Sequence, residues 1–382
     1  MRGSLVRSSG LAIAFVMAVA ACGSDPRTGV DAATVATTYA DLVAAAYQAS
    51  IDSAATMQVA IDDFLSDPTD ATLAAAKTAW LTARDDYNPT EAFRFYDGPI
   101  DNPENGREGQ INAWPLDEAY IDYVADAPEA GIINDPAGYP AITAEVLVEA
   151  NEDGGETNIS TGWHAIEFLL WGQDLAIDGP GARPLADYTT AANADRRATY
   201  LSLVTDLLIS DLQSVQSEWV EGGSYRAEFL GDPEAAIEKI LRGIGALSAG
   251  ELAGERMAVA FETRDEEDEH SCFSDNTNAD VVGDLVGTQM VYLADFPGID
   301  GPALSDFVAA TDPDLDDTLR EQLAASLELA RAFPTTFDQM ATAPDGDPAR
   351  QALADSIAAI EEQGETIARV ATALGKTITL EV

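Results

Sequence analysis

The chain has 382 residues, with 67 acidic and only 20 basic side chains, so its formal net charge at pH 7 is -47. A chain this acidic is repelled by nucleic acid and by anionic lipid headgroups, and we expect no nucleic-acid partner. Its acidity fits either cation binding or a solvated surface suited to saline surroundings, where salt screens self-repulsion. The two cysteines, Cys22 and Cys272, exclude a disulfide framework, so stability must come from a buried core.

The first residues have the pattern of an export signal. Arg2 and Arg7 give a basic start, residues 11–21 are apolar and small, and Cys22 follows directly. The apolar segment is too short for an ordinary membrane span. Small residues that end at a cysteine resemble a bacterial lipoprotein signal, in which the cysteine carries the lipid. We therefore expect residues 1–22 to be a lipoprotein signal peptide that ends at a lipidated Cys22.

A short tether is expected after this cysteine, over residues 23–31. Gly23 and Ser24, rather than Asp, follow Cys22, which by analogy with lipoprotein sorting favours the outer membrane. The alternative is a plain cleaved signal in which Cys22 is incidental. In either case the fold is expected to begin near residue 32.

Helical spacing of apolar residues predicts the first elements of that fold. A long helix is expected from about residue 31 to 65, and a second one, after the break at 66–69, runs to about Tyr87, where Pro89 ends it. Residues 97–115 are rich in Gly, Pro, Asn and acids. A loop this long in a compact domain is usually functional or flexible.

The segment 162–171 contains the most informative motif, a histidine and a glutamate three residues apart in an apolar run. On a helix this spacing places His164 and Glu167 on one face, about one turn apart. A carboxylate in apolar surroundings is unfavourable unless it is paired or bound to a metal. The spacing alone leaves two interpretations open: a metal site, or a histidine hydrogen-bonded to a glutamate on the same helix.

Helical patterns dominate the rest of the chain. After a Gly- and Pro-rich connector at 172–187, helices are expected at about 194–219 and 233–261, and an acidic turn at 265–270 precedes further helices and turns over 279–375. Strand signals are scarce, and the best of them, at 377–380, is weak. We therefore predict an all-α protein of two packed helical bundles.

Signatures of hydrolases are incomplete in this sequence. A zincin requires His-Glu-x-x-His and an inverted zincin His-x-x-Glu-His, but here the His164-x-x-Glu167 pair is followed by Phe168. The sequence has neither a nucleophile elbow nor a P-loop. Cys272 lies near His270, yet proximity in sequence does not orient a catalytic pair. We therefore assign no catalytic residue from sequence.

Several separated segments resemble the imelysin family, named after an insulin-cleaving membrane protease, and in particular its iron-regulated lipoprotein branch. The Gly162-x-His164-x-x-Glu167 motif resembles the family signature. The other similar segments are residues 91–95 with 98–101, 108–118, 250–257 and 268–276. Together these segments span roughly residues 35–370 and occur in the expected order.

The resemblance implies two helical bundles with a pocket where they meet. The first bundle, with the motif, would span residues 32–180 and the second 190–376, so that 32–376 form one imelysin-like domain. The resemblance also implies a periplasm-facing protein, anchored to the bacterial cell envelope and involved in iron uptake.

The family motif favours the metal interpretation of His164 and Glu167, and the matching segments add further candidates. The resulting set of candidate metal ligands is His164, Glu167, Glu91, Asp117, Glu118, Glu255 and His270. A single imidazole with carboxylates suits iron or manganese better than a thiolate-selective metal, and zinc or copper is also compatible with it.

Three hypotheses of function follow. The first is a lipid-anchored protein that captures a divalent or ferric ion, or a small iron complex, and passes it to an envelope transport partner. The second is a metallopeptidase of the imelysin type. The third is a non-catalytic lipoprotein whose acidic loops dock another envelope protein.

Overall fold

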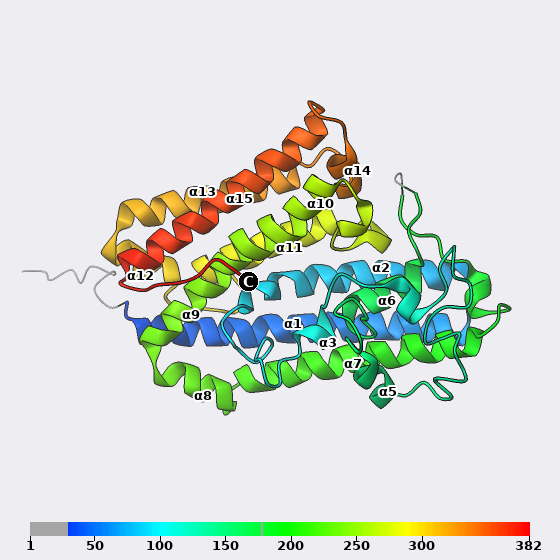
Figure 1. Cartoon of the computed structure of the whole chain (residues 1–382). Coiled ribbons are helices and arrows are strands. Elements are labelled where there is room, and N and C mark those ends of the chain that lie inside the picture. The colour runs from blue at the N-terminus through cyan, green and yellow to red at the C-terminus, as the bar shows by residue number, and fades with distance from the viewer. Residues whose placement is uncertain (1–29, 177–178) are drawn as a thin grey trace, which may run out of the picture.

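The computed structural model describes residues 30–176 and 179–382, and its regular elements are all helical (Figure 1). The all-α prediction is confirmed. No helix among these residues is both long and apolar enough to cross a membrane. The expected signal peptide at 1–22, the lipidated Cys22 and most of the tether at 23–31 lie outside the described residues.

A layer of long helices forms the lower half of the molecule in Figure 1. α1 (Ala32–Ser66) begins where the side chain of Asp31 caps the backbone NH of Thr34. α2 (Asp70–Tyr87) and α7 (Ala194–Trp219) both pack along α1, and the short α6 (Gly162–Trp171) packs against α2 and α7. The buried faces of these helices supply most of the large core.

Short elements, together with α6, connect α2 to α7. They are η1 (Asn88–Phe93), α3 (Glu108–Ile111), α4 (Glu118–Ile121), α5 (Ala144–Ala150) and η2 (Leu185–Tyr188). The expected irregular stretch at 97–115 is largely irregular, with α3 inside it. Asp122 organises this region, because its buried carboxylate accepts hydrogen bonds from Arg183, Arg197 and Asn134.

The C-terminal helices form the upper layer in Figure 1, except that the first of them, α9 (Pro233–Ala246), packs against α1 and leads into this layer. The others are η3 (Leu247–Ala258), α10 (Val259–Thr263), η4 (Glu266–Asp268), η5 (Cys272–Ser274), α11 (Thr277–Leu293), α12 (Leu304–Thr311), α13 (Pro313–Arg331), α14 (Phe337–Thr342) and α15 (Pro348–Ala373). α8 (Ser224–Gly231) joins α7 to this layer.

The helix expected over 233–261 is not uniform. It begins as α9, becomes a π-helix in η3 and ends as α10. π-Helical turns are rare and occur frequently at functional sites. The C-terminal tail packs against this element, since a side chain at Gly250 would collide with the backbone of Leu380. The weak strand signal at 377–380 was wrong, because these residues form no strand.

The buried apolar residues form two hydrophobic cores. The first core takes most of its residues from α1, α2, α6, α7, α8 and α9, and it continues into α11, α12, α13 and α15. The second core lies between η3, α10, α11, α13, α14 and α15. α7, which the sequence analysis places in the second bundle, packs along α1. α11 joins the layers, since Gly283 and Gly287 let it approach η1 closely.

Candidate metal centre

The His164–Glu167 pair lies on α6 with both side chains buried. As the helical spacing predicts, Nδ1 of His164 lies 2.9 Å from Oε2 of Glu167. The other oxygen, Oε1, accepts hydrogen bonds from the backbone NH of Ser274 at 3.0 Å and from its hydroxyl at 2.6 Å. Both oxygens of Glu167 therefore have a partner, and the carboxyl group orients the imidazole of His164.

The second histidine, His270, lies directly beside this pair. It follows η4, and its ring meets that of His164 edge to face, with the centroids 4.7 Å apart. Nδ1 of His270 lies 2.7 Å from Oδ2 of Asp280. Asp280 also accepts hydrogen bonds from the hydroxyl of Ser271 at 2.5 Å and from the amide of Asn88 at 2.7 Å. Each histidine thus binds its own carboxyl group through Nδ1.

Burial determines the protonation of these groups. It lowers the pKa of His164 well below the ordinary value and, with the nearby guanidinium of Arg256, lowers the pKa of His270 to about 4. Both imidazoles are therefore neutral at pH 7, which is the form that binds metals. Burial also raises the pKa of Glu167 to about 8. Among the described residues, Nε2 of His164 is buried and has no hydrogen-bond partner.

Asp280 carries the fixed negative charge of this cluster. Burial opposes its ionisation, but the guanidinium of Arg84 and the hydrogen bond from His270 hold its pKa well below the usual range. Nε of Arg84 lies 3.4 Å from Oδ1 of Asp280. An ionised carboxylate only accepts hydrogen bonds, so Nδ1 of His270 donates to it and the lone pair of Nε2 is left available.

Glu91, a predicted ligand, is held instead by an ion-pair network. Its buried carboxylate accepts hydrogen bonds from Tyr87 at 2.7 Å, Arg94 at 2.7 Å and Arg256 at 2.5 Å. Burial opposes its ionisation, but Arg94 and Arg256 outweigh that effect and hold the pKa of Glu91 well below its usual range. Asp284 extends the network through Arg256. These contacts give Glu91 a role in joining η1 to η3.

The remaining predicted ligands are also separate from the histidine pair. Asp117 is exposed and caps α4 by accepting a hydrogen bond from the backbone NH of Ala119. Glu118 is half-buried. After burial, its negative charge is the largest cause of the raised pKa of Glu267 in the acidic turn. Glu255 is exposed on η3. Of the seven predicted residues, the structure therefore brings together His164, Glu167 and His270.

Sequence reasoning missed two residues that hold this cluster together, Ser274 and Asp280. Ser274 lies in the similar segment 268–276, but its hydroxyl gives no sign of a distant glutamate partner. Asp280 follows that segment, in the first turn of α11. Asp280 had one signal in the sequence, which is a carboxylate among small and apolar residues on a helix. The same kind of signal singled out Glu167.

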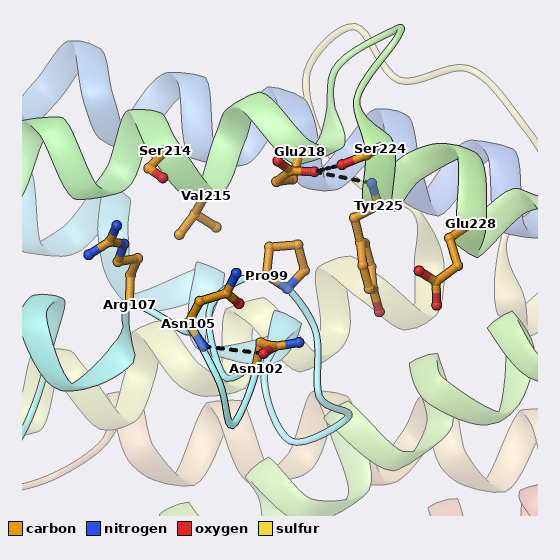
Figure 2. A pocket seen from close by; sticks show the side chains of 10 residues that line it. All are labelled: Pro99, Asn102, Asn105, Arg107, Ser214, Val215, Glu218, Ser224, Tyr225 and Glu228. Carbon is orange, nitrogen blue, oxygen red and sulfur yellow. Dashed lines mark hydrogen bonds between the residues drawn. The ribbon is translucent and has the colours of Figure 1, made fainter.

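A hollow at another place on the surface has a volume of about 380 Å³ (Figure 2). It lies between the loop around Asn102 and Asn105 on one side and α7 with α8 on the other. Glu218 accepts hydrogen bonds from Ser224 and from the backbone NH of Tyr225 at its rim. None of the predicted metal ligands lines this hollow, so it is distinct from the histidine cluster.

Two solved structures have a similar fold. One is described as an iron-regulated protein A precursor from Parabacteroides distasonis. It is 20% identical to this chain with a TM-score of 0.65, and the match covers 90% of this chain and 93% of that protein's chain. The other is an imelysin-like protein from Psychrobacter arcticum. It is 14% identical with a TM-score of 0.63, and the match covers 92% of this chain and 98% of that protein's chain. At these identities the likeness supports the fold alone.

Sequence comparison extends the relationship. The chain is 25% identical over 338 residues to iron-regulated protein A of Synechococcus elongatus, across 85% of this chain and 82% of that protein. The model of the imelysin family matches residues 43–366, a range that includes both histidines and most of the two helical layers. The chain therefore belongs to the imelysin family.

Proposed function

We propose that this protein is a metal-binding member of the imelysin family, anchored to the bacterial cell envelope, and that iron is its cargo. One observation carries the proposal: two neutral imidazoles lie side by side, each with Nδ1 bound to a carboxyl group. In metalloproteins, a ligating histidine almost always donates its other ring NH to a carboxylate, carbonyl or water, which fixes the tautomer and raises ligand basicity.

The residues present fit a transition metal. Nε2 of His164 is a buried nitrogen without a hydrogen-bond partner, which is unfavourable unless a ligand satisfies it. We assign Nε2 of His164 and Nε2 of His270 as the metal-binding atoms. Imidazole suits iron, zinc and copper. Iron is favoured because a relative of 25% identity is named an iron-regulated protein.

The carboxyl groups have a different role in this proposal from the one expected. Glu167 orients His164 and is itself held by hydrogen bonds from Ser274. Asp280 orients His270. The guanidinium of Arg84 pairs with Asp280 and balances its negative charge inside the buried cluster.

This arrangement supports binding over peptide hydrolysis. A metallopeptidase needs a carboxylate within reach of a metal-bound water as general base. Both oxygens of Glu167 are hydrogen-bonded, to His164 and to Ser274. The convergence of two histidines and two carboxyl groups also supports an ion site over a purely partner-docking lipoprotein.

Metal content tests the proposal. Protein purified without chelator or affinity metal should contain close to one equivalent of transition metal by elemental analysis. His164→Ala should lose it while keeping its helical circular dichroism. Glu255→Ala is a matched control, because Glu255 lies in a similar family segment but is exposed. Equal metal content in the wild type and His164→Ala would overturn the proposal.

The anchor is a separate part of the proposal. It rests on the sequence pattern of residues 1–22, with Cys22 as the lipidated residue. A tethered, periplasm-facing protein would deliver iron to a transport partner in the envelope. Mass spectrometry of protein extracted from membranes should find the chain beginning at a Cys22 that carries acyl groups. A mature chain without acyl groups would remove the anchor and leave the metal proposal intact.

A further inference from the structure

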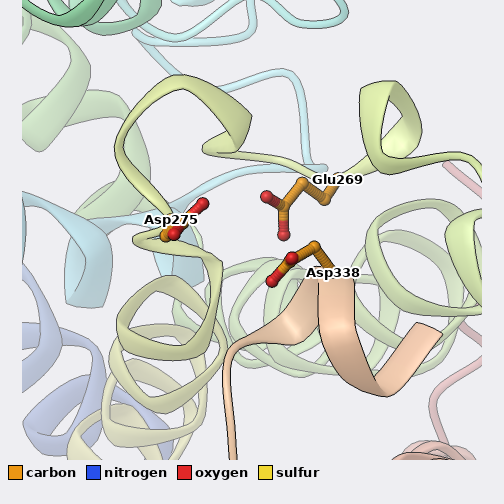
Figure 3. A group of neighbouring side chains, drawn as sticks. All are labelled: Glu269, Asp275 and Asp338. Atoms are coloured by element: carbon orange, nitrogen blue, oxygen red, sulfur yellow. The ribbon is translucent and has the colours of Figure 1, made fainter. Parts of the chain in front are cut away.

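We propose a second cation site, for a hard ion of the calcium class, formed by Glu269, Asp275 and Asp338. One carboxylate oxygen from each of these residues lies within 4.8 Å of the other two. Figure 3 shows the three side chains converging from separate segments. Among the described residues, no other group of three histidine, cysteine or acidic side chains brings its donor atoms this close.

Two of these carboxylates are buried and incompletely satisfied. Glu269 is 1% exposed and Asp338 is 3% exposed. Oε2 of Glu269 and Oδ1 of Asp338 have no hydrogen-bond partner within the described parts of the chain. Leaving a buried carboxylate oxygen unpaired is costly, and a bound cation would satisfy both atoms at once. Asp275 is only half-buried and gives the site an opening toward solvent.

The surrounding charge is negative. No Lys, Arg or His of the described residues forms an ion pair with any of the three carboxylates. A fourth acid, Asp174, shares a side-chain hydrogen bond with Asp275. Burial and the charges of Asp338 and Asp174 raise the pKa of Asp275 to about 7. A cation is the ligand that would relieve this mutual repulsion.

The chemistry of the oxygens favours calcium. Calcium binds oxygen at about 2.3–2.6 Å, so one ion joins oxygens up to about 4.6–5.2 Å apart. Magnesium, at about 2.0–2.1 Å, demands near-ideal octahedral geometry and gives up its water reluctantly, so a site of three carboxylates from separate segments suits calcium better. A set of three carboxylates without nitrogen or sulfur selects a hard cation over the transition metals that suit imidazole.

This site would join segments that hold the histidine cluster. Glu269 precedes His270, and its backbone carbonyl accepts a hydrogen bond from the indole of Trp114 at 3.0 Å. Asp275 follows Ser274, the partner of Glu167. Asp338 lies in the first turn of α14, which packs in the second core. An ion bound here would fix the 269–275 loop to the C-terminal bundle without contacting the imidazoles.

Calorimetric titration of the full-length, chelator-treated protein with calcium chloride tests this site at 0.15 M salt. We expect saturation at one calcium per chain, at least tenfold weaker binding of magnesium, and a rise in thermal unfolding temperature with calcium. Asp338→Asn should weaken calcium binding at least tenfold. Absence of saturable binding, or an Asp338→Asn titration equal to that of the wild type, would overturn the proposal.

Asp314→Asn is a matched control for this change. Asp314 lies in the first turn of α13, as Asp338 does in α14, and the backbone carbonyl of each accepts a hydrogen bond from a threonine four residues later. Asp314 is exposed, so its substitution should leave the titration unchanged. If Asp338→Asn does not fold, Asp275→Asn takes its place, since asparagine tolerates the left-handed backbone at this position, where φ is 56°.

A second comparison separates this site from the histidine cluster. His164→Ala removes an imidazole but none of the three carboxylates, so its calcium titration should match that of the wild type. Loss of calcium binding in His164→Ala would place calcium at the histidines and would overturn the proposal of a separate site.

Discussion

The imidazole of His164 meets that of His270 edge to face, with the ring centroids 4.7 Å apart. His164 comes from α6 in the first helical layer, whereas His270 lies in the loop that precedes α11. Each ring is fixed through Nδ1 by its own carboxyl group. The family motif therefore supplies half of the centre, and a segment from the C-terminal half of the chain supplies the other half.

Ser274 tests whether the orientation of Glu167 matters for metal binding. Ser274→Ala removes the hydroxyl that donates to Oε1 of Glu167. We expect metal affinity to fall about tenfold, as is typical for outer partners of a ligating histidine, and stability to fall by about 1 kcal/mol. Calorimetric titration with ferrous iron under anaerobic conditions measures the first effect and urea unfolding the second.

Ser326→Ala provides the control for this experiment. Its hydroxyl is buried and hydrogen-bonded to Gln363 between α13 and α15, away from the histidines. The substitution should lower stability by about the same 1 kcal/mol and leave iron affinity unchanged. An equal loss of iron affinity in both variants would indicate a general effect of destabilisation.

Glu91→Gln distinguishes a structural carboxylate from a metal ligand. Removing this charge leaves the buried guanidinium groups of Arg94 and Arg256 less compensated. We expect a loss of about 3 kcal/mol in the free energy of unfolding, measured in urea. Metal content per folded chain should be unchanged. A variant that keeps its stability but loses its metal would restore Glu91 as a ligand.

The contact of α11 with η1 requires glycine at position 287. A side chain there would collide with the backbone of Pro89, so Gly287→Ala must push the two elements apart. We expect a destabilisation of about 1–3 kcal/mol from overpacking. Gly231→Ala is the control, since a side chain there meets open space. Similar unfolding midpoints for the two variants would argue against this close approach.

Asp122 should make stability depend on pH. Burial opposes its ionisation, but Arg197 and Arg183 hold its pKa below the ordinary value of 3.8. A depressed carboxyl pKa contributes stability that is present above the unfolded-state pKa and is lost as the pH falls through the folded-state pKa. Asp122→Asn should therefore cost about 3–5 kcal/mol at pH 7 and progressively less below pH 4. Urea unfolding at several pH values measures this gap, and a constant gap would contradict the assignment.

The fold was largely predictable because helical periodicity is a local property. The expected helix at 194–219 has the bounds of α7, and the expected first helix at 31–65 differs from α1 by one residue at each end. Which helices share a layer was not predictable in the same way. The packing of α7 along α1 is an example, because its apolar stripe does not specify whether α1 or a later helix covers it.

The site was predictable only where its partners are close in sequence. The spacing of His164 and Glu167 implies their contact, and both interpretations left open by the sequence share this geometry. His270 came from the family resemblance. The partners Asp280 and Ser274 depend on how the 269–275 loop folds back onto α6, which no local pattern encodes. Glu91 and Glu255 lie in segments that resemble the family, but neither is part of the histidine cluster. Glu91 pairs with arginine, and Glu255 faces solvent.

Anomalous diffraction from crystals soaked with ferrous iron would locate the bound ion. We expect an iron peak in contact with Nε2 of His164 and close to His270, and its loss in His164→Ala crystals of the same form. A peak only at Glu269, Asp275 and Asp338, or none near either imidazole, would contradict this expectation.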